Sequence, residues 1–198
     1  MSVEFWFEFA STYSYPAAMR IEGAAAAAGV PIVWRPFLLG PIFAAQGWRD
    51  SPFNLYPAKG RYMWRDLERT CAGLGLAWRR PTAFPRSGLL AARVAIAAAD
   101  EAWLPAFVRA VYQANFADDR DITDRTVIAG VLADLGQPAA EVIARAETSA
   151  VKARLRQCGE EATQRGIFGA PSFFVDGELF WGNDRLGEAL ALAARGQP

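Results

Sequence analysis

The sequence predicts an α/β protein whose sheet is built from both ends of the chain, with a long helical region inserted between them. The N-terminal end gives strand, helix and strand patterns, and the C-terminal end gives a helix, two strands and a final helix. Between them, from Gly40 to about Glu147, the pattern is helical, with no convincing strand. The 198 residues, 53% of them hydrophobic, suffice for one substantial core or for a small domain carrying a second one.

The N-terminal elements form a strand–helix–strand unit. Aromatic and apolar residues dominate the run from Val3 to Phe9, which is typical of a central strand. A helix is expected from about Tyr13 to Ala28, with Ser11 or Thr12 as its N-cap. A second short strand is expected from Ile32 to Phe37. This order implies two parallel strands joined by a right-handed crossover.

Helical periodicity recurs along the region that follows. Five helices are expected there, at Gly60 to Leu74, Gly88 to Ala102, Trp103 to Asn115, Asp124 to Asp134 and Ala139 to Ala146. One further helix, from Thr148 to Arg165, leads the chain back to the sheet. No glycine-rich or serine-rich linker separates these parts, so the helices should pack against the sheet.

The C-terminal elements form a hairpin followed by a helix. Two strand-like runs, Ser172 to Val175 and Glu178 to Trp181, flank a D-G pair, which is a strong hairpin signal. The final helix is expected to run to Ala194, with Asn183 or Asp184 near its N-cap.

The complete order of elements is that of a thioredoxin-like fold with a helical domain placed in the crossover. We therefore expect two domains. Residues 1–40 and 148–198 form the thioredoxin-like domain, and residues 41–147 form an inserted all-helical domain.

Composition excludes several functional classes. Lysine and arginine together number 21, as do aspartate and glutamate, so the basic excess of a nucleic-acid binder is missing. The sequence has no histidine, so a Ser-His-Asp or Cys-His mechanism is excluded. The two cysteines, Cys71 and Cys158, are far apart and support neither a metal site nor a disulfide framework. No secretory signal or membrane-spanning run is present in the sequence, so we expect a cytoplasmic protein that binds neither nucleic acid nor membranes.

The first candidate functional residue is Ser11, which lies where a strand ends and a helix begins. Ligands bind at this edge of open α/β sheets, and helix N-termini favour anions. Redox enzymes of this fold carry C-x-x-C here, whereas this chain reads Ser11, Thr12, Tyr13, Ser14 and cannot cycle a dithiol at that place. Ser11 is either a plain helix cap or a hydroxyl that donates a hydrogen bond to an external thiolate.

Three further motifs are candidates for ligand binding, and two of them have a plain structural alternative. Pro171 either is the cis-proline of this fold, exposing the backbone of Ala170 to an extended peptide such as glutathione, or is an ordinary trans proline. The F-W-G-N-D-R motif either binds a carboxylate at the start of the last helix, with Asp184 pairing an ammonium, or is a helix cap with a solvated ion pair. Asn54 and Lys59 supply an amide and a cation for an anionic substrate or a glutathione carboxylate.

Taken together, these motifs make the chain resemble the 2-hydroxychromene-2-carboxylate isomerases and, more broadly, the kappa-class glutathione transferases. The resemblance runs nearly end to end, and two departures are Thr12, where the family usually has proline, and Glu8, where aspartate is common. It rests on F-E-F-A-S-T-Y-S-Y from Phe7, R-P-F-L-L-G from Arg35, N-L-Y-P-A-K-G-R-Y from Asn54 and G-I-F-G-A-P-S-F-F-V-D-G-E-L-F-W-G-N-D-R-L from Gly166.

The resemblance implies a glutathione-dependent isomerase that interconverts 2-hydroxychromene-2-carboxylate and o-hydroxybenzylidenepyruvate, or a related intermediate of aromatic-hydrocarbon catabolism. Its substrate would be a small aromatic carboxylate, and because relatives tend to be dimers we expect a homodimer. Ser11 matches the serine that stabilises the glutathione thiolate. The cofactor-binding positions it implies are Ala170, Pro171, Trp181, Gly182, Asn183 and Asp184, and the substrate positions are Asn54, Lys59 and Phe84.

Two alternative functions stay open beside the isomerase. A kappa-class glutathione transferase or peroxidase would consume glutathione, whereas isomerisation regenerates it. A redox-inactive thioredoxin-like binding or chaperone module would show no activity that depends on glutathione. A disulfide oxidoreductase is the weakest interpretation, because Ser11 and Ser14 replace both sulfurs.

Overall fold

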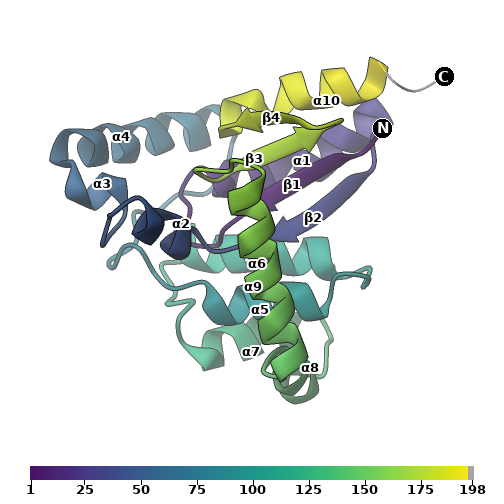
Figure 1. The fold of residues 1–198 in the computed structure, drawn as a ribbon. Helices are drawn as coiled ribbons and strands as arrows, with labels where there is room; N and C mark the ends of the chain where they lie inside the picture. The colour runs from purple at the N-terminus through teal and green to yellow at the C-terminus, as the bar shows by residue number, and fades with distance from the viewer. Residues whose placement is uncertain (196–198) are drawn as a thin grey trace.

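The computed structural model describes residues 1–195 and contains a four-stranded sheet with helices on both faces (Figure 1). Strand β1 (Val3–Phe7) pairs parallel with β2 (Ile32–Pro36) and antiparallel with β3 (Ser172–Val175). Strand β4 (Glu178–Trp181) pairs antiparallel with β3 at the edge, giving the order β2-β1-β3-β4. The strand–helix–strand unit, the hairpin and the thioredoxin-like α/β class are therefore confirmed.

Strand β1 lies inside the sheet and buries side chains on both faces. Phe5 and Phe7 belong to the larger hydrophobic core, whereas Trp6, between them, belongs to a smaller core on the opposite face. Because successive strand residues point to opposite faces, a run of aromatic residues contributes side chains to both cores. The strand ends at Phe7, two residues before its predicted end.

The helices divide between these two cores. Helices α1 (Ser14–Ala28) and α10 (Leu186–Arg195) contact each other and pack on the larger core. On the other face, α2 (Leu39–Ala45) contacts α9 (Ser149–Gln164), and both contribute side chains to the smaller core (Figure 1). The sheet is thus covered on both sides, and the C-terminal end of β1 is left between the two layers.

The region between β2 and α9 is helical, as predicted. The helices that follow α2 are α3 (Pro52–Leu55), α4 (Pro57–Gly73), α5 (Leu89–Ala97), α6 (Leu104–Phe116), α7 (Arg125–Asp134) and α8 (Ala139–Ala146). The five helices predicted there are confirmed, α8 with the predicted bounds and the other four with shifted ends. Helices α2 and α3 were not predicted, because they have seven and four residues and show little periodicity.

The helical region packs on the sheet, as expected from the lack of a linker. Phe107 and Tyr112 of α6 share one core with Phe9, which follows β1. The domain boundaries at residues 40–41 and 147–148 stay a prediction, and residues 196–198 of the predicted thioredoxin-like domain lie outside the described residues. In the part of the chain that is described, the helices are too short or too polar to cross a membrane.

A close helix contact shapes the region where α3 meets α4. A Cβ atom on Gly60 would overlap the carbonyl oxygen of Phe53, whereas a Cβ atom on Gly73, on the same helix, would meet nothing within 4 Å. We expect Gly60→Ala to lower the free energy of unfolding by about 2 kcal/mol, because the backbones must separate. Denaturant unfolding measures this change. The matched variant Gly73→Ala should be neutral or slightly stabilising, and equal effects of the two variants would contradict the close contact.

Candidate active site

A cavity of about 1700 Å³ opens at the C-terminal end of β1. Its wall combines the residues that follow β1, parts of α2 to α4, the segment before α5, the residues that enter β3 and the residues that leave β4. Segments far apart in sequence therefore meet at one edge of the sheet, as expected for an open α/β fold. Of the predicted site residues, those on the wall are Ser11, Lys59, Phe84, Ala170, Trp181, Gly182, Asn183 and Asp184.

The hydroxyl of Ser11 makes two hydrogen bonds at the base of this cavity. Its Oγ donates to the carbonyl oxygen of Ala170 at 2.8 Å and accepts from the backbone N–H of Ser14, the first residue of α1, at 3.2 Å. Ser11 is thus a helix cap and also contacts the predicted ligand-binding backbone. Thr12 is buried, and its hydroxyl lies 3.1 Å from the sulfur of Met63.

The peptide bond between Ala170 and Pro171 is cis, which is the first of the two alternatives considered for Pro171. The carbonyl oxygen of Ala170, however, accepts the Ser11 hydroxyl rather than standing free for a ligand. Pro171 itself does not line the cavity, and its carbonyl oxygen accepts from the N–H of Gly182 at 2.9 Å. Pro171 therefore positions the segment that leaves β4 instead of forming the wall.

The segment after β4 differs from the predicted helix cap. Residues Asn183–Arg185 form a 3-10 turn before α10, and no side chain caps it. The side-chain oxygen of Asn183 accepts from Arg20 of α1 at 3.0 Å, and its carbonyl also accepts from Arg20. Gly182 has φ of 113°, a conformation that suits glycine. Asn183 and Asp184 therefore lie near the start of the final helix, as predicted, but the Asn183 side chain does not cap it, because its oxygen accepts from α1 instead.

Trp181, the last residue of β4, and Asp184 of the following turn both have exposed side chains on the cavity wall. Trp181 is 51% exposed, and its ring lies 4.8 Å from that of Phe168. Asp184 is exposed and forms an ion pair with Arg185 at 3.3 Å. The solvated pair considered as an alternative is therefore present, and it leaves the Asp184 carboxylate beside the cavity.

Of the three predicted substrate residues, two line the cavity and one does not. Asn54 does not line the cavity. Its amide donates to the carbonyl oxygen of Phe84 at 3.2 Å and to the Asp50 carboxylate at 3.0 Å. Lys59 lines the cavity, with its ammonium 4.9 Å from the centre of the Tyr56 ring. Phe84 also lines it. Asn54 thus supports the wall at Phe84, whereas Lys59 and Phe84 face the cavity.

Sequence reasoning missed Glu8 as a residue of this site. It lies on the cavity wall, is 8% exposed and accepts a hydrogen bond from the N–H of Ala10 at 3.2 Å. Burial raises the pKa of its carboxyl group from 4.5 to about 7, against the lowering effect of the N–H groups of Ala10 and Leu39. The signals in the sequence were a charged residue inside an aromatic strand pattern and the resemblance, which places an acidic residue at this position.

Two buried residues of α6 hold the chain that leads from β1 to Ser11. The hydroxyl of Tyr112 donates to the carbonyl oxygen of Glu8 at 2.8 Å, and the amide of Asn115 donates to that of Phe9 at 3.2 Å. Asn115 is held in turn by Arg86 at 3.2 Å. The position of Ser11 therefore depends on contacts with the helical region.

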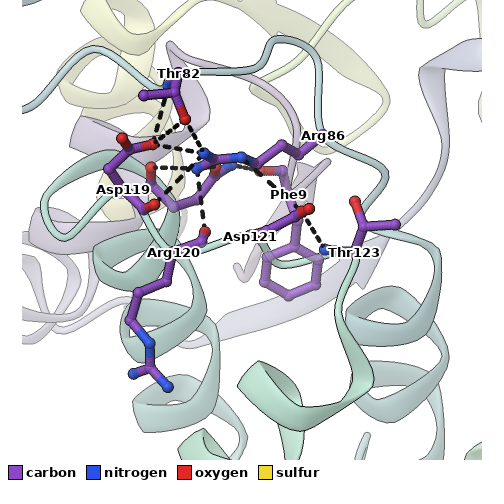
Figure 2. A network of polar contacts seen from close by, with 8 residues as sticks. Phe9, Thr82, Arg86, Asp119, Arg120, Asp121 and Thr123 are labelled. Carbon is purple, nitrogen blue, oxygen red and sulfur yellow. Dashed lines mark hydrogen bonds and ion pairs between the residues drawn. The ribbon is translucent and has the colours of Figure 1, made fainter.

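Figure 2 shows the network that surrounds the Arg86 guanidinium. Arg86 is 6% exposed and forms an ion pair with Asp119 at 2.5 Å. It also donates to the hydroxyl of Thr82 at 3.0 Å and to the carbonyl oxygen of Arg120 at 3.1 Å. One buried cation thus joins the segment before α5 to the end of α6 and the turn that follows.

Replacing Arg86 by methionine tests this network. We expect a loss of about 2 kcal/mol in the free energy of unfolding, because several buried acceptors lose their donor while most of the apolar volume remains. Thermal unfolding should show a midpoint lower by about 6 °C. The same substitution at Arg125, which pairs with Glu147 on the surface, should change stability by less than about 0.5 kcal/mol. A neutral R86M variant would contradict the structural role of the network.

Comparisons with known proteins match nearly the whole chain. Residues 2–192 match the DSBA-like thioredoxin domain. The 2-hydroxychromene-2-carboxylate isomerase of Sphingobium xenophagum is 32% identical over 186 residues, 93% of this chain and 94% of that protein. The glutathione S-transferase kappa 2 of Caenorhabditis elegans is 26% identical over 198 residues, covering 93% of this chain and 88% of that protein. A solved 2-hydroxychromene-2-carboxylate isomerase superposes with a TM-score of 0.88 at 25% identity, covering 98% of this chain and 95% of that one.

Proposed function

The chain belongs to the DSBA-like thioredoxin domain family, and from that premise we propose that it is a glutathione-dependent isomerase acting on 2-hydroxychromene-2-carboxylate or a related intermediate of aromatic-hydrocarbon catabolism. The observation that carries the proposal is the hydroxyl of Ser11 at the start of α1, in contact with Ala170 and in place of a cysteine. The predicted resemblance to the isomerases is confirmed, and it supports this reaction class.

The residues of the cavity fit glutathione in charge and size. The helix start at Ser11 offers a hydroxyl donor and a positive dipole end, which favour an anion such as a thiolate. Trp181, Gly182, Asn183 and Asp184 form a wall that carries one carboxylate, that of Asp184, which suits the ammonium of an α-amino acid end. At about 1700 Å³, the cavity holds a tripeptide and a second molecule together.

When bound, glutathione would supply the thiolate nucleophile that the chain lacks at this position. Ser11 would turn its O–H from the Ala170 carbonyl toward the sulfur and favour the charged form. Lys59 would attract the substrate carboxylate, and the ring of Phe84 would contact the aromatic part.

The homodimer and a cytoplasmic location belong to this proposal as predictions. A second candidate function, a kappa-class transferase, is favoured by the similarity to glutathione S-transferase kappa 2. The amount of free glutathione distinguishes the two activities, because conjugation consumes the thiol and isomerisation returns it.

A thermal-shift titration with glutathione, followed by a thiol assay after turnover, tests the proposal. At about 100 times the dissociation constant, the ligand should stabilise the protein by about 2.7 kcal/mol. Free thiol should then stay constant while 2-hydroxychromene-2-carboxylate reacts. A fall in free thiol with turnover would support the transferase instead, and no shift with glutathione would leave the redox-inactive binding module.

A further inference from the structure

We propose that Glu8 is the proton acceptor of this site: it takes the proton from the thiol that binds at Ser11 and returns it when the sulfur is released. The inference rests on the proposed function, since it assumes that glutathione binds in the cavity. It adds a role for a side chain that neither the motifs nor the comparisons assign.

Glu8 shares one cavity and one turn of the chain with Ser11, where the thiol would bind. Glu8 and Ser11 line the same cavity, and the N–H of Ser11 donates to the carbonyl oxygen of Glu8 at 2.9 Å. The carboxylate oxygen Oε1 accepts from Ala10, the residue that precedes Ser11, at 3.2 Å. The turn that carries the Ser11 hydroxyl therefore also carries the carboxylate, within reach of a shared ligand directly or through one bridging water.

The segment before α5 encloses this carboxylate from another side. A Cβ atom on Gly88 would lie 3.5 Å from Oε1 of Glu8 and 2.7 Å from Cβ of Phe9. The absence of a side chain at Gly88 lets the backbone cover Glu8, so the carboxylate is shielded except where it meets the cavity. Such burial disfavours the charged form and prepares the group to accept a proton.

Backbone N–H groups, not cations, stabilise the charged form of Glu8. From α6 the neighbouring ionisable group is Tyr112, whose pKa burial raises well above 10, so it stays protonated. The cations that share the cavity are Arg49, Lys59, Arg86 and Arg185, and the guanidinium of Arg86 already pairs with Asp119.

The other carboxylates on the cavity wall have side-chain partners. Asp50 accepts from Asn54, Asp66 accepts from Tyr13, and Asp184 pairs with Arg185. Arg185 in turn pairs with Glu188. Glu8 therefore differs from them in having only backbone donors, and burial brings its pKa to about 7, close to neutral pH. A group with that pKa can both take and return a proton.

The proton balance of the step is simple. The S–H bond breaks, the sulfur keeps the electron pair, and an O–H bond forms on the Glu8 carboxylate. The reverse transfer on release restores both groups, so no oxidant or other reactant is needed. A chain with no histidine has no imidazole for this task.

A proton inventory of glutathione binding tests the proposal. Calorimetry in buffers of different ionisation enthalpy counts the protons released, and ultraviolet difference absorbance counts the thiolate formed. Measured above pH 7, where Glu8 is ionised, the wild type should release fewer protons than the thiolate it forms. In Glu8→Gln the protein has no carboxylate at this position to take the thiol proton, so each such proton is released to the buffer. The number of protons released should then equal the number of thiolates formed.

Two matched variants complete the experiment. Asp66→Asn removes a charge from the same cavity while keeping an acceptor for Tyr13, and it should behave as the wild type. Glu8→Asp keeps a carboxylate and should restore a proton release below the thiolate count. Equal proton-to-thiolate ratios in the wild type and Glu8→Gln would overturn the role of Glu8. An absence of glutathione binding by the wild type would instead overturn the proposed function.

Discussion

Replacing Ser11 by alanine should lower the glutathione-dependent turnover number by about 10²-fold, the usual cost of one preorganised donor. The hydroxyl is the side-chain donor that the start of α1 offers to the sulfur, and it already lies 2.8 Å from the backbone of Ala170. Steady-state kinetics measure the change. Loss of the hydrogen bond to Ser14 should also cost about 1 kcal/mol of stability, so rates must be compared well below the unfolding temperature.

Ser87 provides the matched control for this prediction. It lines the same cavity, and its hydroxyl accepts only from the nearby N–H of Leu89 at 3.4 Å among the contacts of the described chain. Ser87→Ala should leave the turnover number within a small factor of the wild type. If Ser11→Ala turned over substrate as fast as Ser87→Ala, the hydroxyl of Ser11 would have no part in the reaction.

Replacing Glu8 by glutamine should stabilise the folded protein by about 3 kcal/mol above pH 7. The folded-state pKa of Glu8, about 7, lies above its unfolded value of 4.5 because the carboxyl group is buried. The folded state therefore binds more protons between these two values, and wild-type stability falls as pH rises from 4.5 to 7. The gain from glutamine is largest above pH 7 and small below 4.5.

Urea unfolding at about pH 5 and about pH 8 measures this dependence. Glu141→Gln, at an exposed position of α8, should change stability little at either pH. A Glu8→Gln variant that is less stable than the wild type at about pH 8 would contradict the burial cost. A destabilising group at this position is consistent with a functional role, because natural sites often give up stability for activity.

The sequence predicted the elements whose signals are local. The D-G pair between two apolar runs gave both strands of the hairpin with the bounds found in the structure. The helices predicted to begin at Asp124 and Thr148 are α7 and α9, and these two residues cap them. Helix α3 was missed because four residues show no period, and its position depends instead on the close approach at Gly60.

The candidate site was predicted where a motif coincides with a sheet edge, and missed where partners come from distant elements. Ser11 and the cis bond before Pro171 follow from the fold pattern. Asn183 was expected to cap a helix, but Arg20, 163 residues away in sequence, takes its oxygen atoms. The raised pKa of Glu8 results from burial by other elements of the fold. The burial of a single carboxylate cannot be recognised from the residues that surround it in the sequence.

The central claim is that a bound thiol, presented by Ser11, drives an isomerisation. The most direct measurement follows the absorbance of 2-hydroxychromene-2-carboxylate and o-hydroxybenzylidenepyruvate with purified protein, with and without a small amount of glutathione. We predict that both compounds approach one equilibrium mixture faster with protein and glutathione together than with either alone. Equilibration at the uncatalysed rate in the presence of both, or an equal rate without glutathione, would contradict the account.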